Sequence, residues 1–136
     1  MTYLAALQAA LSAEHATIYG YGIAGARLSG KDQQYATAAL EAHMLVRDRL
    51  TAVITAIPAT PVAARAAYQL PFAVHGPTGA RTLAAHLEQG CAGADWDLIA
   101  ASATASSLRS LAIGWLGAAA ERTNHWGAQQ ALPGQP

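Results

Sequence analysis

Residues 58–78 read PATPVAARAAYQLPFAVHGPT, and this stretch decides the fold. Four prolines and Gly76 prevent a long helix from passing through it, although residues 62–70 are compatible with a short one. A segment of roughly 21 residues reaches about 70 Å when extended, whereas a helix of about 26 residues is about 39 Å long. The stretch therefore predicts a crossover that runs the whole length of a helical bundle.

Apolar residues recur every three or four positions on both sides of this crossover, which is typical of helices. Ser29-Gly30 separates the first two helices, with Asp32 as the expected N-cap of the second, and Ser106 or Ser107 is expected to cap the last. The predicted helices cover residues 2–28, 32–57, 78–102 and 106 to about 126. The prediction is an all-α, antiparallel four-helix bundle over 1–127 with one long crossover at 58–78, followed by a flexible tail over 128–136.

The composition narrows the classes of function. Eight basic and eight acidic residues cancel, so no electrostatic surface for nucleic acid or an anionic membrane is expected. The single cysteine, Cys91, excludes an internal disulfide and is typical of a reducing compartment. The longest apolar stretches, 16–26 and 111–120, are shorter than the roughly 20 residues of a membrane span. With no basic leader at the start, a cytoplasmic protein is expected.

Charged residues interrupt the apolar seams of the helices at one level of the predicted bundle. Antiparallel topology places most of them within about 10 Å of one another along the bundle axis, because a helix rises 1.5 Å per residue. Buried charges cost several kcal/mol each unless they are paired or bind a metal, so a polar cluster is expected here. The candidates are Glu14, His43, Arg47, Glu88, Arg122 and His125.

The same positions carry a family resemblance. Single glutamates stand on the first and third helices, and the other two helices read Leu40-x-x-His43 and Arg122-x-x-His125. Ferritin-like carboxylate proteins place a Glu on each of two helices and Glu-x-x-His on each of the other two. The chain resembles the ferritin-like superfamily over nearly its whole length. The runs LSAEHATIYGYG at 11–22, His43 with Arg47-Asp48, TPVAA at 60–64 and YQLP at 68–71 resemble an uncharacterised actinobacterial family of ferritin-like proteins, which has no established activity.

Departures from that pattern bear on the choice among three interpretations. The bridging glutamates of a di-metal site are replaced by Leu40 and Arg122, and arginine keeps its positive charge in proteins. The first interpretation is a degenerate, non-catalytic or binding protein without a cofactor, whose polar core pairs Arg47 and Arg122 with Glu14 and Glu88 around His43. The alternative is a metal-dependent oxidoreductase or metal-binding protein that holds iron or another divalent metal at Glu14, His43, Glu88 and His125. A third is a small-molecule binder with tyrosines and tryptophans as its walls.

Two further features give expectations about association and reactivity. Gly20, Gly22 and Gly25 lie within the first helix and favour close approach of another backbone or subunit, so a homodimer is expected. Cys91 lies on an apolar seam and is expected to be a small buried residue, not a nucleophile. The sequence identifies no ligand.

Overall fold

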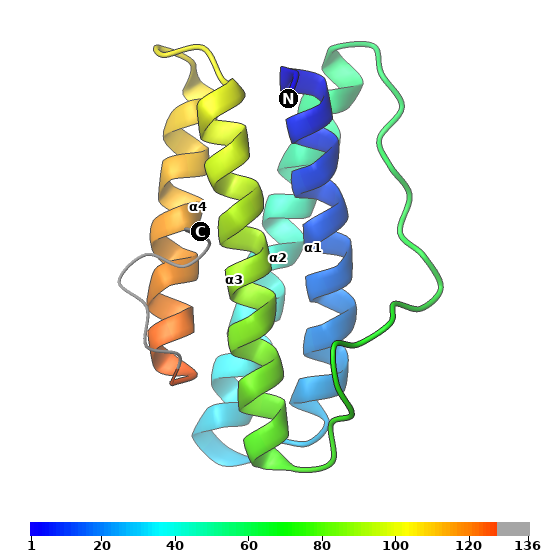
Figure 1. Ribbon diagram of the computed structural model, residues 1–136, viewed down its shortest axis with the longest axis vertical. Coiled ribbons are helices and arrows are strands. Elements are labelled where there is room, and N and C mark those ends of the chain that lie inside the picture. The colour runs from blue at the N-terminus through cyan, green and yellow to red at the C-terminus, as the bar shows by residue number, and fades with distance from the viewer. Residues whose placement is uncertain (128–136) are drawn as a thin grey trace.

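The computed structural model describes residues 1–127 and consists of four long helices with no strand in that range. Helices α1 and α2 form one antiparallel hairpin, and α3 and α4 form the other (Figure 1). The all-α four-helix bundle is therefore confirmed, whereas the predicted flexible tail lies outside the described residues. The helices are α1 (Tyr3–Gly25), α2 (Gly30–Ala56), α3 (Pro77–Ala101) and α4 (Ser107–His125).

The helix ends follow the local sequence, with one correction. Ser106 caps α4, as predicted, because its side chain accepts a hydrogen bond from Arg109 N–H. Asp32 is not the N-cap of α2 but lies in its first turn, and Ser29 holds the cap position. Gly30 has a φ of 58°, which glycine adopts readily, so the chain turns early and α2 begins before Asp32.

The predicted crossover is confirmed and occupies residues 57–76 between α2 and α3. It runs along the outside of the bundle beside α1 (Figure 1). Gln8 holds the first part of the crossover against α1 through two hydrogen bonds. Its side-chain amide donates to Thr60 O at 2.7 Å and accepts from Val62 N at 2.8 Å. Near its end, Arg27 Nε donates to Val74 O at 2.9 Å. No helix forms over residues 62–70.

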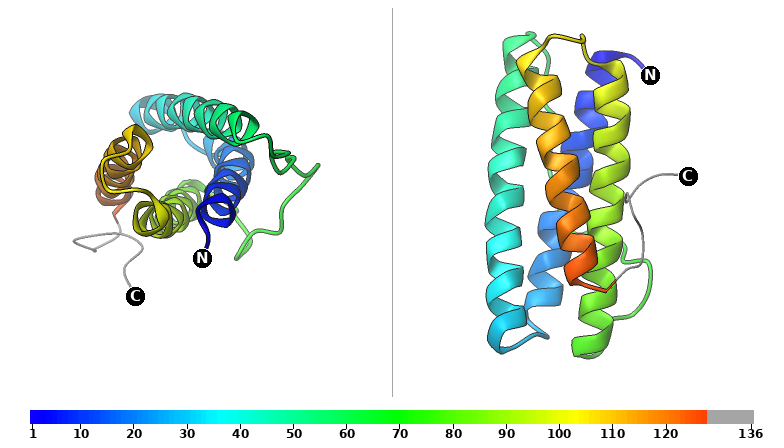
Figure 2. Two further views of the ribbon diagram at one scale, coloured as in Figure 1. Left: turned by 90° about the horizontal axis from the view of Figure 1, so that it is seen from above. Right: turned by 90° about the vertical axis from the view of Figure 1, so that its left-hand side faces the viewer.

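The four helices pack as a ring (Figure 2). Their core contains two large apolar clusters and a small third one made of Ala92, Leu116 and Ala119. Helix α1 contacts both α2 and α3, and α3 contacts α4. One large cluster surrounds Leu7, Leu50 and Leu98, and the other surrounds Leu83 and Trp126. Many of the remaining core residues are alanines, which let the helices approach closely. The polar residues described below lie between the two large apolar clusters.

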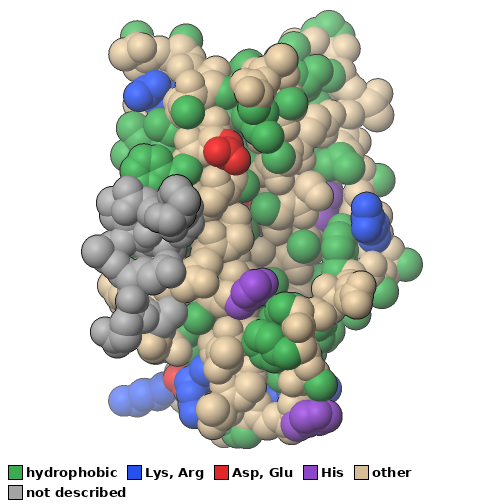
Figure 3. All heavy atoms as spheres, viewed as in Figure 1, with side chains coloured by type: hydrophobic (Ala, Val, Ile, Leu, Met, Phe, Trp, Pro, Cys, Tyr) green, Lys and Arg blue, Asp and Glu red, His purple; other side chains and the backbone are tan. Residues whose placement is uncertain are grey.

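The surface carries few charges, and sparse charged side chains are visible on the face shown in Figure 3. Within residues 1–127, none of the helices has the length and hydropathy to cross a membrane.

The packing of a single chain explains why position 20 on α1 holds glycine, because a Cβ there would lie 2.5 Å from Leu87 Cδ1. Gly22 and Gly25 have no such neighbour. The homodimer therefore stays a prediction that these two glycines support.

Alanine substitutions at Gly20 and Gly22 should have different effects on stability. Gly22→Ala should stabilise the protein by about 0.5–1 kcal/mol, because alanine is the better helix former and nothing lies within 4 Å of the added Cβ. Gly20→Ala should lose that gain, since the Leu87 side chain must move to make room. Urea unfolding of both variants measures the difference. Equal stabilisation at both positions would contradict the packing of α1 against α3.

Candidate functional site

A buried cluster of polar side chains lies near the middle of the bundle, and each helix contributes to it. We call Glu14 and Tyr21 of α1, His43 of α2, Glu88 of α3 and Arg122 of α4 the central cluster. His43 lies between the two carboxylates: its Nδ1 is 2.6 Å from Glu14 Oε2 and its Nε2 is 2.9 Å from Glu88 Oε2. Glu14, His43, Glu88 and Arg122, which the sequence analysis grouped in one polar cluster, thus lie together.

One oxygen atom of Glu88 accepts three hydrogen bonds. Oε2 receives Tyr21 O–H at 2.5 Å, Arg122 Nε–H at 2.9 Å and His43 Nε2–H. Tyr21 Oη in turn accepts from Trp126 Nε1–H at 3.0 Å. The other oxygen, Oε1, is buried and has no hydrogen-bond partner within residues 1–127. The three donors on Oε2 come from α1, α2 and α4, so this carboxylate connects α3 to every other helix.

The charges of the central cluster balance. Burial alone would lower the pKa of His43, but hydrogen bonds with Cys91, Glu14 and Glu88 outweigh it and raise that pKa to about 12. Burial would raise the pKa of Glu88, yet His43 and Arg122 hold it below its ordinary value. His43 is therefore an imidazolium and Glu88 a carboxylate. Two cations, His43 and Arg122, face two anions, Glu14 and Glu88.

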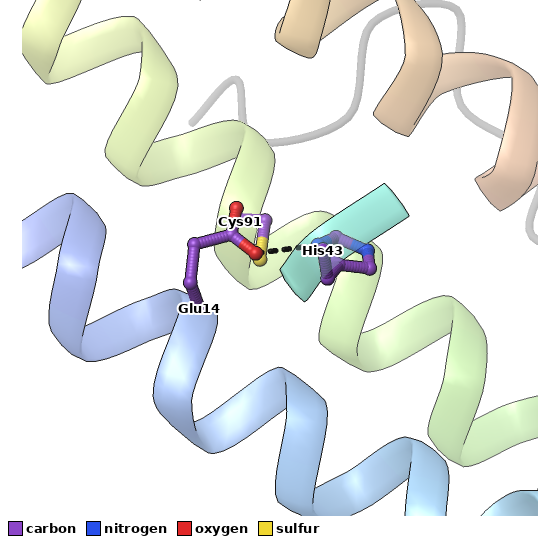
Figure 4. Close-up of side chains that lie close together, drawn as sticks. All are labelled: Glu14, His43 and Cys91. Carbon is purple, nitrogen blue, oxygen red and sulfur yellow. Dashed lines mark hydrogen bonds and ion pairs between the residues drawn. The ribbon is translucent and has the colours of Figure 1, made fainter. Parts of the chain in front are cut away.

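Cys91 of α3 lies at the Glu14 side of His43. One ligand atom each from Glu14, His43 and Cys91 lie within 4.8 Å of one another, and Figure 4 shows these three side chains pointing toward one another. Thr17 Oγ1 is 3.0 Å from Cys91 Sγ. Burial, with the charge of Glu14, raises the pKa of the Cys91 thiol to about 12. Cys91 is a buried residue, as the sequence indicated, but its place beside two potential metal ligands was missed.

Asp95 is a second residue that the sequence analysis missed. It lies one helical turn beyond Cys91 on α3 and is only 3% exposed. Burial raises the pKa of its carboxyl to about 8, and the largest contribution from a neighbouring charge is that of Glu14. The spacing Glu88, Cys91, Asp95 follows one helix face and was the available signal.

Arg47 and His125 were predicted to join the cluster, and the structure places both elsewhere. Arg47 Nε donates to Asp48 Oδ1 at 3.0 Å in a partly exposed pair. His125 is exposed and stacks on Tyr35, with ring centroids 3.4 Å apart, while its Nε2 lies 3.6 Å from Asp32 Oδ1. On α2 the neighbouring Val46 is buried instead of Arg47. At the end of α4, Thr123 and Trp126 are buried, and the exposed His125 points away from the core.

A cavity of about 220 Å³ lies under the crossover, between it and helices α1 and α3. Small residues form its floor, including Ala13, Ala16 and Gly90, while Tyr68 lies on its crossover side. Thr17 also lines it, and the Thr17 hydroxyl contacts Cys91 Sγ. The cavity therefore approaches the central cluster from the Cys91 side.

Comparisons with known proteins identify a family and a similar fold. The family model described as "Domain of unknown function (DUF4439)" matches residues 6–136. A solved structure, titled as a crystal structure of a conserved hypothetical protein, rv2844, from Mycobacterium tuberculosis, has a TM-score of 0.86 and 35% sequence identity. That match covers 90% of this chain and 92% of the other. No curated protein matches the chain. Because the family model covers nearly the whole sequence, this chain belongs to the DUF4439 family, whose function is unknown.

Proposed function

We propose that this chain is a bundle of ferritin-like architecture that has lost the di-metal centre of such proteins and acts as a non-catalytic binding protein. Two antiparallel hairpins joined by a crossover support the architecture. Glu14 and Glu88 stand at the two single-glutamate positions of the ferritin-like pattern. In this proposal a hydrogen-bonded ion cluster takes the place of the metal pair.

The contact between Arg122 and Glu88 carries the proposal. A di-metal centre of this kind needs a glutamate three residues before each histidine, and these positions hold Leu40 and Arg122. Arg122 Nε donates to Glu88 Oε2 at 2.9 Å, so a permanent cation occupies the side of the site where a bridging anion would lie. The residues present do not fit a pair of metal ions.

The alternative ligand set of Glu14, His43, Glu88 and His125 has weaker support. His125 is stacked on Tyr35 at the surface, and both nitrogens of His43 face carboxylates. Only Glu14, His43 and Glu88 of that set lie together. One specific observation, the position of Cys91 beside Glu14 and His43, favours a different site for a single ion.

Iron oxidation tests the proposed function. Chelator-treated protein, purified without a metal-affinity tag, should oxidise iron(II) in air no faster than buffer does and should bind no pair of iron ions. The double variant Leu40→Glu, Arg122→Glu restores both bridging positions, and it should gain iron binding that the parent lacks. The parent with His125→Ala serves as a control and should behave as the parent does.

Two results would contradict the proposal. One is two iron ions per parent chain with faster iron(II) oxidation, and the other is loss of iron binding on His125→Ala. Either would show that the ferritin-like centre is functional despite Arg122.

A further inference from the structure

We propose that the Cys91 side of the central cluster binds one thiophilic divalent cation of the Zn²⁺ class, with Glu14, His43 and Cys91 as its ligands. This rests on the proposed function and deepens it, because it names the ligand class of the binding protein. The site holds one ion, and its ligand set differs from that of a ferritin-like pair because it contains a thiol.

The ligand set fits such an ion in type and in position. Thiolate, imidazole and carboxylate are the ligands of zinc, whereas magnesium and calcium take oxygen ligands. The three residues come from α1, α2 and α3, and their ligand atoms lie within 4.8 Å of one another. Bonds of about 2.0–2.3 Å in tetrahedral geometry place ligand atoms roughly 3.3–3.7 Å apart. His43 Nδ1 and Glu14 Oε2, now 2.6 Å apart, need to separate by less than about 1 Å.

The surrounding contacts match those that orient ligands in metal sites. A metal-bound histidine commonly donates its other N–H to a carboxylate, which fixes the ring. Here His43 Nε2 lies 2.9 Å from Glu88 Oε2, and Tyr21 and Arg122 hold that same oxygen. Arg122 therefore contacts the carboxylate on the Nε2 side of the ring, across the imidazole from Nδ1. The positive charge of Arg122 stabilises the Glu88 carboxylate and lies away from the proposed cation position.

Exchange of protons for the cation leaves the buried charge unchanged. Metal binding displaces the Nδ1 proton of His43 and the thiol proton of Cys91, and both pass to solvent. Without metal, two cations face two anions. With metal, Arg122 and one dication face the Glu14, Glu88 and Cys91 anions, so the total is again zero. The core therefore accepts this exchange without leaving a buried charge uncompensated.

Asp95 is a further acidic side chain near the proposed site. The residue is buried, with 3% of its surface exposed. It lies one turn from Cys91 on α3, and Glu14 is the neighbouring charge that acts on it most. A cation at the three ligands would therefore lie near this carboxyl group.

The cavity under the crossover supplies an entry path. It has a volume of about 220 Å³ and reaches Thr17, whose hydroxyl lies 3.0 Å from Cys91 Sγ. Gly90, the residue before Cys91, also lines it. A metal site needs such a path as well as ligands.

Zinc and cobalt binding test the inference directly. Chelator-treated protein, purified without a metal-affinity tag, is dialysed against Zn²⁺, and bound metal is measured by elemental analysis. One equivalent per chain is expected. In a parallel titration with Co²⁺, a near-ultraviolet charge-transfer band should appear, because a thiolate bound to cobalt produces one. Cys91→Ser should abolish this band and weaken zinc binding by about 100-fold or more. His125→Ala is the matched control and should change neither measurement.

The outcomes separate this inference from the proposed function. Absence of stoichiometric zinc, or cobalt binding without the thiolate band, overturns the site in the unaltered protein, whether or not Cys91→Ser folds. Zinc binding unchanged by Cys91→Ser overturns it as well. None of these results restores a di-metal centre, which only the iron experiment above would reveal.

Discussion

Arg122→Leu is expected to lower the free energy of unfolding of the metal-free protein by about 2–4 kcal/mol. The Arg122 side chain is 15% exposed and pairs with Glu88, which is fully buried. Removal of the guanidinium leaves the carboxylate in the core with the His43 imidazolium as the one close cation. Loss of one partner of a buried ion pair is costly because the other charge stays out of water without compensation.

Arg47→Leu provides the matched control for this prediction. Both arginines were predicted to join the polar cluster, and each substitution replaces a charged guanidinium side chain by leucine. Arg47, however, pairs with Asp48 at the surface, where ion pairs contribute little. Its replacement should change stability by no more than about 0.5 kcal/mol. Urea unfolding of the two variants side by side measures the contrast, and equal losses would show that Arg122 does not neutralise the core.

Asp95→Asn should stabilise the metal-free protein by about 3–5 kcal/mol near pH 9 and have almost no effect near pH 4. The pKa of Asp95 is raised from 3.8 in a model peptide to about 8, and burial is the largest cause. The Glu14 and Glu88 charges contribute to this rise, whereas His43 and Arg122 oppose it. Asparagine resembles the protonated carboxyl in shape and stays neutral at every pH.

The sign follows from proton binding. Between pH 4 and 8 the folded protein holds a proton on Asp95 that the unfolded chain has released. Stability from this group is therefore complete below the unfolded pKa and is lost as the pH rises through the folded pKa. The asparagine variant does not lose it, so its advantage grows with pH.

Asp97→Asn is the control for Asp95→Asn, because Asp97 lies on the same helix but is exposed. Its effect should stay within about 0.5 kcal/mol at every pH. Unfolding measured from pH 4 to 9 decides the matter. A gain for Asp95→Asn that does not change with pH would mean that Asp95 is not the titrating group.

The fold was predictable because its signals are local and strong. Prolines in residues 58–78 exclude a long helix there, and the length of the segment allows it to span the bundle. The helix ends also follow from capping chemistry, except at Asp32, where the φ of 58° at Gly30 moved the start of α2. A positive φ at one glycine is a property of the turn and cannot be read from the side chains around it.

The candidate site was predictable in part, and the errors share one cause. Glu14, His43 and Glu88 were identified because charged groups on apolar seams need partners. Arg47 and His125 were misplaced because alanine-rich helices allow the inward face to shift by one residue with little change in apolar pattern. Val46 and Trp126 are buried in their place. The same ambiguity explains why Asp95, which is buried on α3, was not identified.

The three hydrogen bonds on Glu88 Oε2 bear on this rotational ambiguity. Alanine surfaces on neighbouring helices pack almost equally well in several rotations, so packing alone selects one arrangement weakly. A shift of one residue turns a helix by about 100° and moves it by about 1.5 Å, which takes any donor out of reach of a single oxygen. Tyr21, His43 and Arg122 meet Oε2 from three helices in one alignment. We infer that this atom fixes the mutual rotation of all four helices, so that a chain poor in large apolar side chains still folds to one structure.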